Sequence, residues 1–133
     1  MEIRKWGIIV KITTGTDIIE IDRIKKSVEE TENKFLNRVF TESEIEYCES
    51  KNVQKYQHYA ARFAAKEAVF KAVSYKLKDK YEISWKNVEV IPDKQGRPQV
   101  YFVDFNLEGL QSIDISLSHC KQYAVANVIC VCD

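Results

Sequence analysis

One stretch near the middle of the chain, residues 62–72, constrains the fold more than any other. It reads RFAAKEAVFKA, and its Ala, Lys, Glu and Arg are good helix formers with no Gly or Pro among them. At about 100° per residue, Glu67 lies between Phe63 and Phe70 on one side, while alanines and valines cover most of the rest. A helix that is apolar around most of its girth is buried. The stretch therefore predicts the middle of a long buried helix over roughly residues 54–76.

Glu67 is thus a carboxylate on an inward-facing, aromatic-flanked surface. An unpaired buried carboxylate costs several kcal/mol, so Glu67 requires a cation, a metal ion or a proton as its partner. The simplest alternative is an ion pair with Lys71, one turn further along the helix. A basic block at residues 51–80 suits an anionic ligand held with a divalent metal, or else is a solvated helix face. Within it, Lys66 is expected to reach solvent or a phosphate group.

A second carboxylate, Asp17, lies far upstream. It follows residues 3–12, whose β-branched side chains predict a strand. Gly15 permits a tight turn or a close backbone approach beside it. Asp17 is then expected where a strand gives way to a helix, which is typical of a ligand-binding side chain. Alternatively it caps the helix that begins near residue 21, and its position taken alone favours that interpretation.

Composition indicates one globular domain, residues 1–133, because 45% of the residues are hydrophobic and 11% aromatic. The net charge of +0 favours neither nucleic acid nor a membrane surface as a partner. No apolar run approaches the ~20 residues of a membrane span, and the N-terminal residues lack a signal-peptide pattern. We therefore expect a cytoplasmic protein. Its four cysteines show no CxxC spacing and are expected to be free, reduced thiols.

The remaining patterns predict an α+β protein. An amphipathic helix is expected over residues 20–31, and Thr41 with Glu44 forms a capping-box pattern at the start of another helix. Four strands are expected in the second half of the chain, at residues 83–91, 99–105, 113–119 and 123–131. Their short connections favour antiparallel pairing. We expect an antiparallel sheet packed against the long buried helix.

Five motifs occur in order along the chain: Gly15-Thr16-Asp17-Ile18, Phe40-Thr41-x-x-Glu44, the stretch at residues 62–72, Gly96-Arg97-Pro98, and Ser116-Leu117-Ser118-His119. In their order and spacing the chain resembles the phosphopantetheinyl transferases, and within them the short holo-acyl-carrier-protein synthases. The resemblance covers almost the whole chain. It implies that family's fold, an enzymatic activity and a homotrimer with active sites between subunits.

The implied reaction moves 4′-phosphopantetheine from coenzyme A to a serine of an apo acyl carrier protein and releases adenosine 3′,5′-bisphosphate. The family's magnesium ligands correspond to Asp17 and Glu67, and its diphosphate-facing lysine to Lys71. These three are the expected catalytic residues. Arg62 adds positive charge for the phosphates. The expected contacts to coenzyme A are Arg62, Lys71, Gly96, Arg97, Pro98, Ser116, Ser118 and His119. The serine proton could pass to Glu67, to Asp17 or to a metal-bound water.

Two features depart from the family pattern. Thr13 stands where the family usually has a glycine, which predicts a slightly different approach to Asp17. Arg23 and Lys26 suit docking of an acidic carrier protein, from fatty-acid or polyketide synthesis, but an acidic run at residues 29–32 opposes it. The alternatives are a non-catalytic module that binds a carrier protein or coenzyme A, and a magnesium-dependent nucleotide hydrolase.

Overall fold

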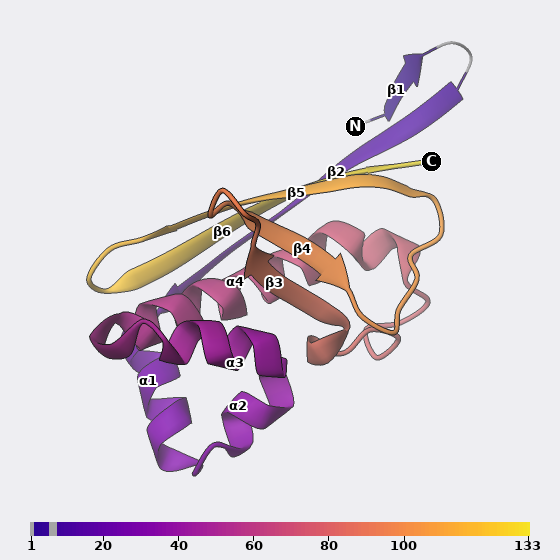
Figure 1. Ribbon diagram of the computed structural model, residues 1–133. Helices are drawn as coiled ribbons and strands as arrows, with labels where there is room; N and C mark the ends of the chain where they lie inside the picture. The colour runs from indigo at the N-terminus through magenta and orange to yellow at the C-terminus, as the bar shows by residue number, and fades with distance from the viewer. Residues whose placement is uncertain (1, 6–7) are drawn as a thin grey trace.

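The computed structural model describes residues 2–5 and 8–133, which form two antiparallel sheets and four α-helices (Figure 1). The strands are β1 (Glu2–Lys5), β2 (Ile8–Glu20), β3 (Val88–Pro92), β4 (Pro98–Phe102), β5 (Leu110–His119) and β6 (Tyr123–Cys132). The helices are α1 (Ile21–Glu30), α2 (Lys34–Val39), α3 (Glu42–Glu49) and α4 (Lys55–Val73). Short 3₁₀ turns lie at η1 (Asn52–Gln54), η2 (Ser74–Lys76) and η3 (Trp85–Asn87).

The larger sheet has the strand order β1-β2-β6-β5, and every neighbouring pair is antiparallel. Strands β2 and β6 pair along most of their length, with Gly15 opposite Val128 and Asp17 opposite Ala126. Strands β3 and β4 form a separate hairpin. The expected α+β class with antiparallel pairing is therefore confirmed.

Helix α4 packs across one face of the larger sheet, mainly against β2 and β6 (Figure 1). The facing side chains of β6 alternate along the strand as a half-buried strand requires, and they are small or medium-sized. The buried members are Ala124, Ala126, Val128, Cys130 and Cys132. Helices α1 and α3 contact α4 as well. The expectation of a long buried helix against an antiparallel sheet is confirmed.

The opposite face of the larger sheet is not covered by any of the described helices (Figure 1). Large apolar side chains project from it into solvent: Ile18 is 61% exposed and Ile129 is 44% exposed. Exposed apolar groups that gather on one face mark an interaction surface more often than isolated ones do.

Several local predictions were wrong. The strand expected at residues 3–12 is divided between β1 and the longer β2, with residues 6 and 7 outside the described part of the chain. Because β2 continues to Glu20, Asp17 lies inside a strand and does not cap α1. Helix α2 was not predicted; it follows Asn33, which takes a left-handed φ of 72°. The segment expected to begin a strand at residue 83 forms η3 first.

Other local predictions hold. Helix α1 buries Ile21, Ile24 and Val28, and the capping box of Thr41 and Glu44 is present at the start of α3. All four cysteines are free thiols, and only Cys120 is exposed. None of the described helices is both long and apolar enough to cross a membrane.

Candidate active site

A close contact between two backbones places the candidate catalytic residues. A Cβ atom added to Gly15 would lie 1.8 Å from the carbonyl oxygen of Ala68, so only glycine fits at this point of β2. One pleat earlier on the same face, the hydroxyl of Thr13 donates to the carbonyl of Ala72 over 2.6 Å. Of the two roles that the sequence allowed for Gly15, the structure therefore shows a close backbone contact and not a tight turn. Thr13 keeps a negative φ and adds a hydrogen bond to α4.

This contact brings Asp17 of β2 next to the last turns of α4. The ammonium of Lys71 lies 3.2 Å from Oδ1 of Asp17 and donates to the carbonyl of Thr16 over 2.8 Å. The ion pair expected as the simplest alternative, between Glu67 and Lys71, is absent among the described residues. Lys71 instead joins the helix to the strand.

The carboxylate of Glu67 has no hydrogen bond or ion pair among the described residues. Its burial raises its pKa above the ordinary value of 4.5, the negative charge of Asp17 raises it further, and Lys71 opposes both. The structure brings Asp17 into an ion pair with Lys71, and Glu67 lies one turn before Lys71 on α4.

The two acids suit a hard divalent cation. Mg²⁺ prefers oxygen ligands and is usually held by one or two carboxylates, with waters and substrate phosphates completing its shell. No group of three or more His, Cys, Asp or Glu in the described part of the chain could hold a metal ion. The donor set therefore fits a magnesium ion whose other ligands come from solvent and substrate, and not a zinc site closed by protein side chains.

A cavity of about 790 Å³ adjoins Glu67. It lies between the end of α4 and the loop that leads to η3. Apolar side chains form much of its wall, among them Phe70, Ile83 and Trp85, and the loop lysines Lys78 and Lys80 also line it. The indole of Trp85 stacks on Phe63 with ring centroids 5.0 Å apart.

A second cavity, of about 580 Å³, collects most of the residues expected to contact coenzyme A. Its lining comes from the β3–β4 turn, from strands β2, β5 and β6 and from helices α3 and α4, and includes Gly96, Arg97, Pro98, Ser116, His119 and Arg62. Ser118 and Lys71, also expected to contact coenzyme A, do not line it. The two cavities share no lining residue.

Among the residues of the second cavity that had not been singled out in the sequence are His58 and Tyr47. The ring of His58 meets that of His119 with centroids 5.9 Å apart, and the guanidinium of Arg62 lies 4.2 Å from the centre of the Tyr47 ring. Burial, and then the positive charge of Arg62, lowers the pKa of His58 to about 4. Its spacing of four residues from Arg62, on one face of a helix, was the available signal.

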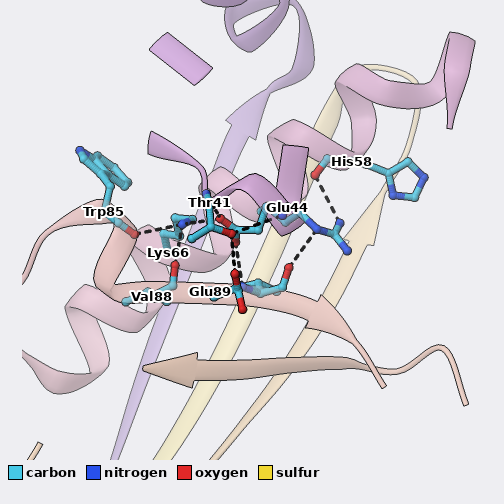
Figure 2. Close-up of polar contacts among 9 residues, drawn as sticks. Thr41, Glu44, His58, Lys66, Trp85, Val88 and Glu89 are labelled. Carbon is cyan, nitrogen blue, oxygen red and sulfur yellow. Dashed lines mark hydrogen bonds and ion pairs between the residues drawn. The ribbon is translucent and has the colours of Figure 1, made fainter. Parts of the chain in front are cut away.

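Lys66 does not reach solvent or a phosphate, so that expectation was wrong. Its side chain is fully buried and forms an ion pair with the equally buried Glu44 over 2.7 Å (Figure 2). Burial lowers the pKa of Lys66, and the negative charge of Glu44 opposes that shift. Lys66 points away from the Glu67 side because successive residues of a helix differ by about 100° in direction.

The residues expected to dock a carrier protein, Arg23 and Lys26, are exposed on α1. Between them, Lys25 forms a loose ion pair with Glu29 over 3.9 Å. The basic side chains of Arg23 and Lys26 are thus accessible on this helix, and Lys25 partly neutralises the charge of Glu29.

Sequence comparison assigns the chain to a known group. Residues 13–128 match the model of the 4′-phosphopantetheinyl transferase superfamily. The chain belongs to this superfamily, and the resemblance drawn from its five motifs is confirmed.

Its relatives identify the type within the superfamily. It is 45% identical over 125 residues to a holo-[acyl-carrier-protein] synthase of Ruminiclostridium cellulolyticum, covering 90% of this chain and 92% of that protein. It is 47% identical over 115 residues to the synthase named for Thermodesulfovibrio yellowstonii, covering 86% and 94%. The expectation of an enzyme of the holo-[acyl-carrier-protein] synthase type is confirmed.

Solved structures of holo-[acyl-carrier-protein] synthases are similar to this fold. The synthase of Bacillus anthracis in complex with CoA (3′,5′-ADP) matches with a TM-score of 0.75 and 33% identity, covering 91% of this chain and 96% of that one. The Helicobacter pylori synthase in complex with coenzyme A matches with a TM-score of 0.74 and 31% identity, covering 88% and 98%.

Proposed function

We propose that this chain transfers the 4′-phosphopantetheine group of coenzyme A to a serine of an apo acyl carrier protein, with Mg²⁺ as the cofactor. The observation that carries the proposal is the arrangement of Glu67, Asp17 and Lys71, in which one acid pairs with a lysine and the other has no partner in the described chain. The relatives named above act as holo-[acyl-carrier-protein] synthases, and two of the similar structures contain coenzyme A or its nucleotide part.

The side chains have distinct roles in this reaction. Asp17 and Glu67 would hold the magnesium ion, which supplies positive charge to the diphosphate when it is bound. The Lys71 ammonium places a second positive charge where negative charge develops on the leaving nucleotide. The serine oxygen bonds to the phosphorus next to pantetheine, the bond to the bridging oxygen breaks, and adenosine 3′,5′-bisphosphate leaves. The serine proton would pass to Glu67, to Asp17 or to a metal-bound water, which are the acceptors that this site offers.

The second cavity would take the nucleotide end of coenzyme A. Arg97 at its rim supplies a positive charge, and His119 and Ser116 supply hydrogen-bonding groups. Gly96 and Pro98 shape the turn, in which Gly96 takes a φ of 85° that favours glycine. Ser118 lies outside the cavity lining, so we give it a role only through the β5 strand that carries its neighbours.

We further infer a homotrimer with active sites between subunits. The cavity beside Glu67 and the cavity for the nucleotide share no lining residue within one chain, and an uncovered sheet face presents Ile18 for association. Light scattering would measure the mass. In a second test, Glu67→Gln and Arg97→Glu chains are unfolded together and refolded. Activity that neither variant shows alone supports a shared site, and no recovery contradicts it.

An intact-mass assay tests the reaction. Apo carrier proteins from fatty-acid and polyketide synthesis are incubated with coenzyme A, with and without a chelator of divalent metals. We expect a mass gain of one phosphopantetheine that the chelator abolishes and that is absent in Asp17→Ala and Glu67→Ala, while the exposed Glu46→Ala retains it. Tight coenzyme A binding with no transfer would indicate a binding module. Release of adenosine bisphosphate without a carrier protein would indicate a hydrolase.

We place the protein in the cytoplasm, with neither nucleic acid nor membrane as a partner.

A further inference from the structure

Among the described residues, strand β3 has a strand partner on one side only. It pairs with β4, with Val88 opposite Phe102 and Val90 opposite Val100 (Figure 1). The backbone groups along its other edge face helices α3 and α4, and no strand in residues 2–5 or 8–133 pairs with them. Buried backbone groups of this kind require hydrogen-bonding partners from elsewhere.

Three charged side chains supply those partners. The Lys66 ammonium donates to the carbonyl of Val88 over 2.5 Å, and the Arg62 guanidinium donates to the carbonyl of Val90 over 3.1 Å. The amide of Val90 donates to Oε2 of Glu44 over 2.7 Å. Side chains from α3 and α4 thus occupy the place of a third strand (Figure 2).

The buried pair at the centre of this edge is fully satisfied. Lys66 donates to Oε1 of Glu44 over 2.7 Å, to the Trp85 carbonyl over 3.0 Å and to Val88, which uses all three of its donors. Glu44 also accepts from the Thr41 amide over 2.9 Å. A buried pair is often no more stabilising than apolar residues of similar volume. Its specific contribution here is the geometry that its bonds impose on β3.

The same strand connects the two cavities. Trp85, whose carbonyl accepts from Lys66, lines the cavity that holds Glu67. At the other end of β3, Gly96 and Arg97 of the β3–β4 turn line the second cavity. A shift of β3 relative to α4 would therefore move a wall of each cavity.

We propose that Lys66 and Glu44 are positioning residues for phosphopantetheine transfer, which hold strand β3 against α4 and so fix the turn at residues 96–98 relative to Arg62. This rests on the proposed function, because it takes the second cavity as the nucleotide site. Neither residue contacts the substrate in this proposal. Loss of the pair is expected to weaken nucleotide binding more than it slows the chemical step.

The test replaces both charges at once, Lys66→Met with Glu44→Leu, so that no single buried charge is left unpaired. We expect the dissociation constant for adenosine 3′,5′-bisphosphate, measured by calorimetry, and the KM for coenzyme A to rise about tenfold or more, with kcat within about threefold. The control is Val69→Ala. Val69 is fully buried on α4 but lines neither cavity, so its loss destabilises the fold without releasing β3.

The outcomes separate this proposal from the proposed function. If the wild type neither binds the bisphosphate nor modifies a carrier protein, the function itself is wrong. If the wild type does both and the double variant matches it, or if Val69→Ala weakens binding equally, the positioning role is overturned. Should the double variant not fold, Glu44→Asp decides, because it keeps both charges and shortens the side chain. A raised dissociation constant supports the proposal, and an unchanged one refutes it.

Discussion

The ammonium of Lys71 lies 3.2 Å from the carboxylate of Asp17, a residue 54 positions earlier in the chain, and Glu67 on its own helix is left without an ion pair among the described residues. The charge of Asp17 is thus neutralised by Lys71, whereas the charge of Glu67 is not neutralised by any described residue. An acid without a protein partner suits the proposed site for a divalent cation, because a full set of protein ion pairs would leave no negative charge for the cation to neutralise.

Substitution of Lys71 tests this arrangement. In Lys71→Met the charge that faces the diphosphate is lost, and we expect kcat to fall by about 10²–10³-fold, as for loss of one preorganised donor. Lys71→Arg keeps the charge and should retain more activity. The exposed Lys34→Met serves as the control. Equal rates for Lys71→Met and the wild type would exclude an electrostatic role for this lysine.

Removal of the Glu67 charge is expected to separate stability from activity. Burial and Asp17 both disfavour the ionised form of Glu67 in the folded protein. Glu67→Gln should therefore raise the thermal midpoint in metal-free buffer while it abolishes transfer. Calorimetry and the mass assay measure the two effects. A lower midpoint would mean that the carboxylate stabilises the fold, contrary to its lack of partners.

Enlargement of residue 15 is expected to disrupt packing. In Gly15→Ala the new methyl group would meet the Ala68 carbonyl at 1.8 Å, and neither backbone can rotate away as a side chain does. We expect a loss of about 3 kcal/mol or more in the free energy of unfolding, measured with denaturant. Thr14→Ala, on the exposed face of the same strand, should change it by less than about 0.5 kcal/mol. A stable Gly15→Ala protein would contradict the close approach.

The acid dependence of stability should report on His58. Its pKa is about 4 in the folded protein, against an ordinary value of 6.5. Below pH 6.5 the unfolded chain binds a proton that the folded chain does not, so the stability tied to neutral His58 is present above 6.5 and is lost as pH falls to about 4. His58→Gln should lose less stability than the wild type across that window. Parallel curves would show that His58 is not held neutral.

Docking of the carrier protein is expected to depend on α1. Arg23→Glu reverses an exposed charge, so we expect the KM for an acidic carrier protein to rise about tenfold at low salt and less at high salt. The KM for coenzyme A should not change, because Arg23 lines neither cavity. An unchanged KM for the carrier protein would place the docking surface elsewhere.

Local patterns predicted much of this fold. The capping box of Thr41 and Glu44 depends on residues three apart, and the alternation of β6 depends on its own sequence, so both were visible without coordinates. Helix α2 was missed because it is short and begins after two residues with positive φ, Glu32 and Asn33. Neither residue is a glycine that would have indicated that geometry.

The candidate site was predicted through its motifs, whereas its contacts were not. Lys71 had an acid at helical spacing, yet it pairs with Asp17 across the fold. Lys66 was expected at the surface because lysine is rarely buried, and its partner Glu44 already had a local role as a capping residue. Pairing between distant segments depends on tertiary packing, which no local pattern contains.

The contact between Gly15 and Ala68 has one more consequence. Asp17 lies two residues beyond this glycine, and Glu67 is the residue before that alanine. The close contact between these two backbones therefore fixes the distance between β2 and α4, and with it the distance between the two acids. Substitutions in the surrounding side chains can alter the charge or the shape of the site. The distance between its two acids, however, depends on residue 15 remaining a glycine.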